Sequence, residues 1–311
     1  MPAKKRHYAF ALLPVLAAIE LVAHAVEVRG VVPDADYQAA AREVGSKAKP
    51  EDLVVFAPGW SDPVGRQHFG ALVTAERAGF TDLTRFPRAF EVAQGGGRRP
   101  ELDWFTVESE TKVGALTVRT LKNPTYEPVI DDLLDHVAHQ KMIVQVRRGG
   151  RDTDCPFVAG AATAGPWGPA TPARRFQCPH GPVGVITMPD VAYSSRHCLY
   201  APLPEPSSHL RVQFLDVKFG KKLRFSHGLH VEGERYQKGA PVEIAMSVPV
   251  ETKSEGEHEK VYGRAVHKDG DGWARLDVDT AELAGNTGDL VFDLHASNPQ
   301  DRLYCFAGTT R

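Results

Sequence analysis

Six segments after residue 200 alternate apolar and polar side chains, and this pattern constrains the fold more than any other feature. The segments are LRVQFLDV, PVEIAMSV, KVYGRAVH, WARLDVDT, DLVFDLHAS and RLYCFAG. Alternation with a period of two places the apolar side chains on one face of a strand. Turns such as Lys268 to Gly272 separate the segments. Short strands at this spacing predict an antiparallel, jelly-roll-like β-sandwich over residues 201–311.

Residues 31–150 mix helical and strand patterns. Asp34 or Asp36 can begin a helix whose apolar positions recur at helical spacing. DLVVFAP is a continuous apolar strand, RAFEVAQ a second strand, and DWFTVES with GALTVRTLKN a hairpin. A further helix is expected in PTYEPVIDDLLDHVAHQ. These patterns predict a small α/β domain, so the fold class expected for the chain is two-domain α+β.

Residues 151–200 show little periodicity. The stretch AGAATAGPWGPATPARR is rich in glycine, proline and alanine, and only GVITM resembles a short strand. This composition is typical of a loop or linker. We therefore expect residues 151–200 to be a Pro/Gly-rich region that connects the two domains.

The N-terminal segment 1–30 is predicted to be a transmembrane anchor. Lys4, Lys5 and Arg6 precede the apolar run YAFALLPVLAAIELVAHAVEV, which has about the ~20 residues that cross a bilayer. A basic flank predicts an N-terminus inside and a chain outside. The alternative is a cleaved signal peptide with Ala23-His24-Ala25 as its cleavage site. Both predict export, so we expect a single-pass protein of the cell membrane with its bulk in the periplasm.

The chain has four cysteines, Cys155, Cys178, Cys198 and Cys305. An even number in an exported protein predicts two disulfides. Of the three pairings that four cysteines allow, we favour Cys155–Cys178 and Cys198–Cys305. No C-x-x-C spacing occurs, which argues against a zinc or redox motif.

The stretch VVFAPGWSDPVGRQHFG is the main candidate ligand-binding loop. Trp60, Asp62, Arg66 and His68 follow the end of an apolar strand directly, and in open α/β sheets ligands bind beyond such ends. Together they offer a stacking surface, a carboxylate, a guanidinium fork and a titratable ring. This combination suits a sugar or sugar phosphate. The alternative is that Asp62 pairs locally with Arg66 and that Trp60 caps the core.

The segment FSHGLHVEGE contains the second candidate set, His227 and His230, with Glu232 and Glu234 close by. The H-E-x-x-H spacing of zinc proteases is absent. In a strand, His230, Glu232 and Glu234 would share one face, where they could contact a metal or a glycan or simply meet solvent. Trp273 is a further candidate contact, although a place in the core is expected for it.

No cofactor is predicted. The alternative is a structural calcium ion bound by the loop HKDGDGW. Asp269 and Asp271 there are the acidic residues of a loop that lacks the closing Glu of an EF-hand. A plain turn between strands is the main expectation for this stretch, and we predict no metal in the binding loop.

The charge balance argues against a nucleic-acid partner. Thirty-seven Lys and Arg residues stand against 39 Asp and Glu residues, for a formal net charge of -2. Proteins that bind nucleic acid carry a basic face or stripe, and the basic residues here are scattered. The expected partners are the membrane, through the N-terminal helix, and a glycan or envelope protein.

Two parts of the chain resemble known families. The closing stretch GWARLDVDTAELAGNTGDLVFDLHASNPQDRLYCFAG is similar to the last strands of galactose-binding-like jelly rolls. The N-terminal segment through PDADYQAAAREV and PEDLVVFAPGW resembles the extracytoplasmic part of bacterial membrane glycosyltransferases that use lipid-linked sugars. In that family an acidic residue after the first membrane helix is catalytic, and Asp34 or Asp36 would occupy its place. The chain departs from that family because it has one apolar span.

The function expected from the sequence is a non-catalytic, carbohydrate- or partner-binding role in cell-envelope glycan biology. The alternative is a glycan-active enzyme, a hydrolase or a glycosyltransferase subunit, with Asp62 and His68 as acid and base. No catalytic residue is assigned under the first interpretation.

Overall fold

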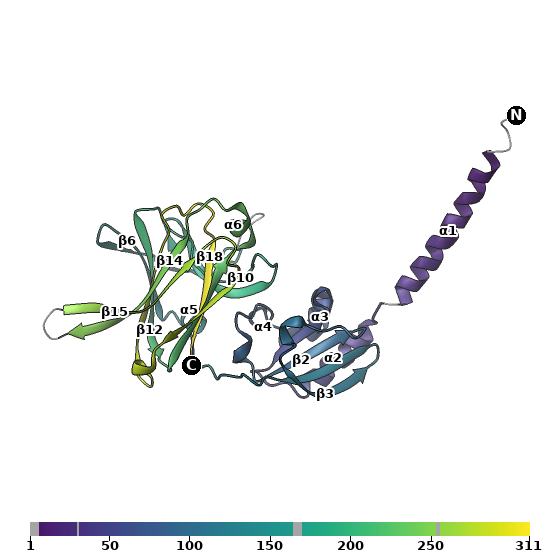
Figure 1. Ribbon diagram of the computed structural model, residues 1–311, viewed down its shortest axis with the longest axis horizontal. Coiled ribbons are helices and arrows are strands. Elements are labelled where there is room, and N and C mark those ends of the chain that lie inside the picture. Colours follow the sequence, from purple (N-terminus) through teal and green to yellow (C-terminus); the bar gives the residue numbers. More distant parts are fainter. Residues whose placement is uncertain (1–5, 30, 164–169, 253–255) are drawn as a thin grey trace. The chain divides into compact units, whose positions relative to one another are not determined.

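The structure is a computed structural model of the 311-residue chain, and it describes residues 6–29, 31–163, 170–252 and 256–311 (Figure 1). The chain forms two compact units. The α/β unit contains residues up to 72 together with 88–122, and the sandwich unit contains residues 73–87 and 123–311. The chain therefore passes between the units three times. The basic residues Lys4 and Lys5, and residues 164–169 of the predicted linker, lie outside the described residues.

The N-terminal segment forms one helix, α1 (Arg6–Arg29). It contains Pro14, and Glu20 and His24 interrupt its apolar run. Among the helices in the part of the chain that the structure describes, none has the length and apolar character that a bilayer span requires. The structure therefore does not support the predicted transmembrane anchor.

The α/β unit is built on a four-stranded sheet in the order β1-β2-β4-β3. Its strands are β1 (Leu53–Ala57), β2 (Arg88–Gln94), β3 (Thr106–Val113) and β4 (Leu116–Lys122). Its helices after α1 are α2 (Asp34–Gly45) and α3 (Asp62–Phe69), with the 3-10 turns η2 (Gly59–Ser61), η3 (Gly70–Leu72) and η5 (Pro100–Leu102). β1 and β2 are parallel, and the other pairs are antiparallel. The chain thus contains a small α/β unit, but the unit is limited to residues up to 72 and 88–122, whereas the sequence predicted residues 31–150.

Apolar side chains explain how the helices pack on this sheet. All five residues of β1 are buried, and α2 buries Tyr37, Ala40 and Val44. α3 approaches β1 closely because position 65 is glycine: a Cβ there would lie 2.3 Å from ring atoms of Phe56. The close approach leaves the start of α3, with Trp60 just before it, at the end of β1.

The sandwich unit consists of two antiparallel sheets. The eight-stranded sheet has the order β16-β13-β18-β11-β10-β9-β8 with β5 paired to β18, and the six-stranded sheet has the order β15-β14-β17-β12-β6-β7. Their strands are β5 (Asp131–Asp132), β6 (Met142–Arg148), β7 (Arg151–Asp154), β8 (Phe157–Ala159), β9 (Arg174–Cys178), β10 (Gly181–Pro189), β11 (Ser195–Tyr200), β12 (Ser208–Lys218), β13 (Lys222–Leu229), β14 (Val242–Thr252), β15 (Gly256–His267), β16 (Ala274–Asp279), β17 (Thr287–His295) and β18 (Tyr304–Thr310).

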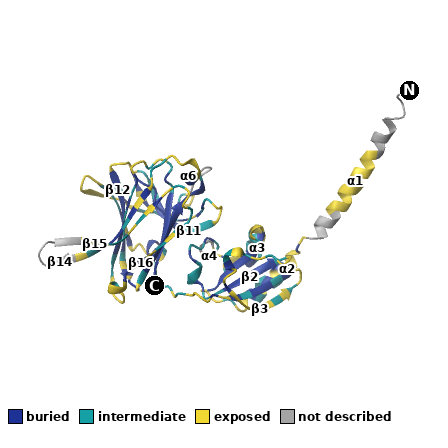
Figure 2. Cartoon of the chain, viewed as in Figure 1, coloured by how far each residue is buried: buried dark blue, intermediate teal, exposed yellow. Residues whose placement is uncertain are grey.

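Short helices complete the sandwich unit. They are α4 (Ala75–Ala78), α5 (Leu133–Ala138) and α6 (Val231–Tyr236), with the 3-10 turns η4 (Leu83–Arg85) and η6 (Ala281–Leu283). The facing sides of the two sheets supply one large core, which includes Val212 and Phe214 from β12, Phe225 from β13 and Phe292 from β17 (Figure 2). Alternate residues of these strands point into the core, as the sequence pattern predicts.

A buried ion-pair network attaches residues 73–87 to the sandwich. The carboxylate of Asp82 lies 2.7 Å from Arg311 and 3.2 Å from Arg224, and it accepts the backbone N–H of Thr84 at 3.0 Å. Burial acts to raise the pKa of Asp82, but the hydrogen bonds from Thr84 and the charges of Arg311 and Arg224 lower it overall. Asp82 is therefore held ionised inside the sandwich unit.

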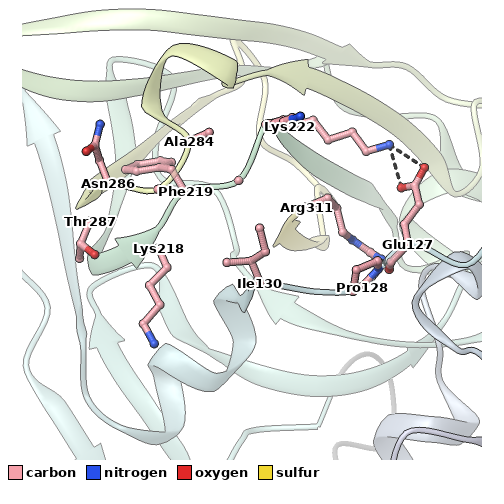
Figure 3. A pocket seen from close by; sticks show the side chains of 13 residues that line it. Glu127, Pro128, Ile130, Lys218, Phe219, Lys222, Ala284, Asn286, Thr287 and Arg311 are labelled. Carbon is pink, nitrogen blue, oxygen red and sulfur yellow. Dashed lines mark hydrogen bonds and ion pairs between the residues drawn. The ribbon is translucent and has the colours of Figure 1, made fainter.

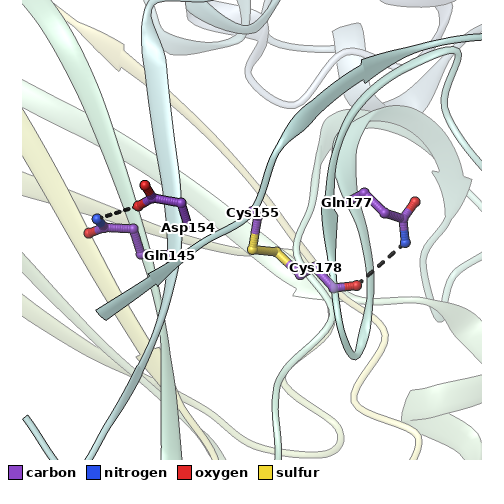
Figure 4. Close-up of a disulfide and its surroundings, with 5 residues drawn as sticks. All are labelled: Gln145, Asp154, Cys155, Gln177 and Cys178. Carbon is purple, nitrogen blue, oxygen red and sulfur yellow. Dashed lines mark hydrogen bonds between the residues drawn. A yellow bond between two sulfur atoms is a disulfide. The ribbon is translucent and has the colours of Figure 1, made fainter. Parts of the chain in front are cut away.

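Both predicted disulfides are present. Cys155 follows β7 and pairs with Cys178 at the end of β9, with Cα atoms 4.7 Å apart (Figure 4). Cys198 of β11 pairs with Cys305 of β18, with Cα atoms 5.7 Å apart. The first bond links the two sheets, because β7 belongs to the six-stranded sheet and β9 to the eight-stranded sheet. The second links the paired strands β11 and β18, and no free cysteine remains.

The predicted domain boundaries differ from the units observed. Residues 151–200, expected to connect two domains, carry five strands, β7 to β11, and both halves of one disulfide. The expected helix over 124–140 is limited to α5, because Asp131 and Asp132 form β5 just before it. β13 and α6, which the alternation pattern did not single out, also belong to the sandwich.

Candidate functional site

The four residues of the predicted binding loop do not converge. They lie on η2 and α3 rather than in an open loop. Asp62 and Arg66 form an ion pair of 2.5 Å one helical turn apart, as the local-pairing alternative predicted. The His68 ring stacks on Tyr37 of α2, with centroids 5.4 Å apart, and its Nε2 lies 3.4 Å from Asp34. Trp60 alone presents a largely free side chain, 69% exposed.

An arginine-rich loop meets the chain beside Trp60. Because β1 and β2 are parallel, their carboxyl ends share one edge of the sheet. After β1 comes Pro58-Gly59-Trp60, and after β2 comes a glycine run that leads to Arg98 and Arg99. A Cβ on Gly97 would lie 2.7 Å from Pro58, and one on Gly59 would lie 2.7 Å from Nη1 of Arg99. The two loops are therefore in direct contact next to Trp60.

A buried carboxylate holds this arginine loop in place. Glu91 of β2 is fully buried. It accepts the backbone N–H of Arg99 at 2.7 Å and Nη1 of Arg119 at 2.9 Å, and it lies 3.4 Å from Nε of Arg98. Burial acts to lower the pKa of Arg119, but hydrogen bonds to Glu91 and Glu110 raise it overall. The loop is thus fixed by charge-assisted hydrogen bonds rather than by its glycines.

The arrangement offers an aromatic face and an outward guanidinium on one edge. The ion pair engages Nε of Arg98, whose side chain is 39% exposed, whereas Arg99 is tied to Glu101 by a hydrogen bond of 2.7 Å. An exposed indole can stack on the apolar face of a sugar ring. A guanidinium can bind a carboxylate, sulfate or phosphate with two parallel hydrogen bonds. Trp60 and Arg98 therefore form the candidate site of the α/β unit.

The sequence pattern pointed to Trp60 but not to the arginine loop beside it. The segment GGGRRP was visible as a loop, yet its place depends on β1 and β2 being parallel neighbours. The signal that could have found it is that both apolar strands end in glycine-containing loops. If two such strands are parallel, the two loops must meet at one edge.

His227 and His230 are buried, which corrects the expectation of a surface contact. His227 lies on β13 and His230 caps α6, where its Nδ1 accepts the N–H of Glu232 at 3.2 Å. The segment from residue 231 is a helix rather than a strand, so His230, Glu232 and Glu234 do not share a strand face. Trp273 packs against the cluster around the second disulfide, as expected for a core residue.

The buried group around His227 is a polar cluster inside the sandwich unit. His227 lies 5.3 Å from His267 between ring centroids, and Nε2 of His267 lies 3.8 Å from Glu234. Burial, with His267 nearby, lowers the pKa of His227 to about 4. Its Nδ1 has no hydrogen-bond partner among the described residues. These features indicate a neutral, desolvated imidazole and not an exposed ligand contact.

The loop HKDGDGW, considered as a calcium site, does not present a set of free ligands for the ion. Asp269 holds the guanidinium of Arg302, with Nη2 at 3.1 Å, and Asp271 accepts the N–H of Lys268 at 2.7 Å. Glu234 accepts the N–H groups of Gly270 at 3.0 Å and Gly272 at 2.8 Å. Within the described residues, no group of three His, Cys, Asp or Glu side chains could hold a metal ion. The stretch is a turn between β15 and β16, stabilised from within.

The outer face of the six-stranded sheet is a second polar surface, but its charges are internally paired. His209 lies 2.5 Å from Asp293 and stacks on His295 with centroids 4.5 Å apart. Arg147 lies 2.8 Å from Asp152, and Arg211 pairs with Glu259. This surface offers hydrogen-bonding groups in one plane, and its described residues include no exposed indole.

Comparisons with known proteins identify no family. No protein-family model matches the chain, and no curated protein matches it significantly. The predicted resemblance to membrane glycosyltransferases has no support in these comparisons.

Solved structures that the chain partly matches include carbohydrate-binding proteins. One is the structure of a promiscuous carbohydrate-binding module of the β-sandwich superfamily. It matches with a TM-score of 0.30 and 9% identity, and the match covers 63% of this chain and 66% of the module's chain. A xylan-binding domain of module family 22 matches with a TM-score of 0.27 and 11% identity over 50% of this chain and 93% of that one. A third structure, of ZmpB from Clostridium perfringens, contains an M60 catalytic domain and the modules CBM51-1 and CBM51-2. It matches with a TM-score of 0.27 and 11% identity, and the match covers 67% of this chain and 19% of the other chain. TM-scores this low carry no argument about the ligand of this chain.

Proposed function

We propose that this protein binds glycans that carry acidic groups, with Trp60 as the stacking surface and Arg98 as the anion anchor. The observation that carries the proposal is the 69% exposure of Trp60 at the carboxyl end of β1, where the arginine loop contacts Gly59. A large aromatic side chain left in water forgoes the free energy of burial. A ligand that covers the ring recovers it.

The chemistry of the edge favours a sugar over a purely apolar ligand. Guanidinium and indole groups together match a ring that has an apolar face and a carboxylate or sulfate at its rim. Glu91 fixes the loop before any ligand arrives, through the backbone N–H of Arg99 and an ion pair with Nε of Arg98. Such preorganisation lowers the entropy cost of binding.

We further propose that the protein works outside the cytoplasm. Two disulfides with no free cysteine support this proposal, because disulfides persist in oxidising compartments. A role in envelope glycan biology then follows from the proposed ligand class.

The enzyme alternative has less support from the geometry. Asp62 and His68 are six residues apart on α3 and have different partners, Arg66 for the carboxylate and Tyr37 with Asp34 for the ring. A general acid and a general base must both reach one reacting group. We therefore assign Asp62 and His68 to packing of α3 and not to catalysis.

Retention on immobilised glycans tests the proposal. The full chain and Trp60→Ala are passed over neutral, uronate-containing and sulfated polysaccharides. We expect retention on the acidic glycans that the variant loses, with no change in melting temperature. Equal retention of both proteins, or retention on none of the glycans, would reject this site.

A further inference from the structure

The sandwich unit contains a cavity that the proposed glycan site does not use. Its volume is about 780 Å3, within the ~300–1,000 Å3 typical of small-molecule sites. Figure 3 shows its lining, which comes from the segment before β5, the β12–β13 turn, the loop after η6 and Arg311 after β18. The lining residues are Glu127, Pro128, Ile130, Lys218, Phe219, Gly220, Lys221, Lys222, Ala284, Gly285, Asn286, Thr287 and Arg311.

The wall of the cavity is apolar and preformed. Pro128, Ile130 and Phe219 face it, and Ile130 is 50% exposed although it is a large aliphatic residue. The backbone of Ile130 donates to the carbonyl of Thr310 at 2.9 Å. Phe219 exchanges two backbone hydrogen bonds of 2.9 Å with the opposite loop, through Asn286 O and Gly285 N. The apolar wall therefore exists without a ligand.

The rim of the cavity has an excess of positive charge. Lys222 is neutralised by Glu127 at 2.7 Å, and Arg311 by Asp82 at 2.7 Å. Lys218 and Lys221 are exposed, and neither has a carboxylate within ion-pair distance among the described residues. Two unpaired ammonium groups at the rim of an apolar cavity match a ligand with one anionic head.

We propose that this cavity binds a single-chain amphipathic anion, an alkyl chain that ends in a carboxylate or phosphate. The chain packs against Ile130, Pro128 and Phe219, and the head is held by Lys218 and Lys221. Burial of the alkyl chain supplies the affinity, which rises with each methylene group that is buried. The two lysines supply the selectivity for an anion over an alcohol.

Isothermal titration calorimetry of the full chain tests this proposal, with octanoate and octyl phosphate below their micelle concentrations and octanol below its solubility limit. We expect both anions to bind, and octanol to bind about tenfold more weakly, because a charged hydrogen bond contributes about 1.5 kcal/mol or more. The affinity for the anions falls with rising salt.

Variants separate the two parts of the site. Lys218→Met with Lys221→Met keeps the aliphatic stems and should weaken both anions about tenfold while octanol binding is unchanged. Ile130→Ser should weaken all three ligands. Lys268→Met, an exposed lysine of the β15–β16 turn, serves as the matched control and should change nothing. Octanol affinity equal to that of octanoate, unchanged anion affinity in the double lysine variant, or binding of none of the ligands would overturn the proposal.

Discussion

The fully buried carboxylate of Glu91 lies 2.9 Å from Nη1 of Arg119, and the same carboxylate accepts the backbone N–H of Arg99. The pair links the interior of the four-stranded sheet to the arginine loop beside Trp60. Glu91 is therefore a structural residue of the α/β unit and a positioning residue for the proposed glycan site.

Replacement of this carboxylate should cost both stability and binding. In Glu91→Gln the guanidinium of Arg119 loses a buried anion, and breaking such a pair typically costs about 3–5 kcal/mol of unfolding free energy. Glycan retention should fall with it, because the loop with Arg98 loses its anchor. Urea unfolding followed by tryptophan fluorescence measures the first effect. Glu43→Gln removes only an exposed pair with Lys47 and should cost less than about 1 kcal/mol; an equal loss in both variants would contradict this role for Glu91.

The sandwich unit should lose stability in mild acid because of His227. Its pKa is lowered from 6.5 to about 4, mainly by burial, so folding favours the neutral ring. The contribution is complete above pH 6.5 and is lost as the pH falls toward 4, by about 3 kcal/mol in total. His227→Phe should remove this part of the pH dependence.

Urea unfolding at pH 7 and pH 4 checks the effect. The wild-type chain should lose about 3 kcal/mol more than His227→Phe between the two values. His139→Phe, which changes an exposed ring, should behave as the wild type does. The same acid sensitivity in His227→Phe and the wild type would show that His227 is not the group responsible.

Residues 73–87 should detach from the sandwich when Asp82 is neutralised. Asp82→Asn leaves Arg224 and Arg311 without their shared buried anion, and we expect a loss of about 3 kcal/mol or more. Limited proteolysis should then cut within residues 73–87 faster than in the wild type. Asp277→Asn removes the more exposed partner of Arg224 and should cost less; unchanged cleavage in Asp82→Asn would reject this network as the anchor.

The two disulfides should contribute unequally. Cys198–Cys305 closes 107 residues and Cys155–Cys178 closes 23. In the chain-entropy model the longer loop stabilises more, here by about 1 kcal/mol. Thermal unfolding of Cys198→Ala with Cys305→Ala, compared with Cys155→Ala with Cys178→Ala, measures the difference. A larger loss from the second pair would indicate that native packing, and not loop entropy, sets the order.

Much of the fold could be predicted from local patterns in the sequence. Alternation over residues 210–217 and 289–297 predicted strands that appear as β12 and β17, because those strands have one face on the core. The cysteine pairing was also predicted correctly. In residues 151–200 only GVITM was expected as a strand, and it lies within β10. β7 and β8 were missed because they are short and lie at sheet edges, where the constraint of a buried face is weak.

The candidate site was only partly visible in the sequence. Trp60 could be identified because it follows a buried strand. Arg98 could not, because its place in the loop that contacts Gly59 depends on the parallel pairing of β1 and β2, in which Ala57 pairs with Ala93, 36 residues further along the chain. His227 was expected at the surface because its side chain is polar. Packing against Phe225 and Tyr304 buries it instead.

The most direct test of the account is the affinity of the full chain for one acidic oligosaccharide, compared among wild type, Trp60→Ala, Arg98→Gln and Trp104→Ala. Trp104 is the matched control, because it is a partly exposed indole of the same unit that precedes β3 at the opposite edge of the sheet. We predict that Trp60→Ala weakens binding by about tenfold or more, at about 1.4 kcal/mol per tenfold. Arg98→Gln should weaken the acidic ligand but not its neutral analogue, and Trp104→Ala should bind as the wild type does. Equal losses in Trp60→Ala and Trp104→Ala, or none in Trp60→Ala, would contradict the account.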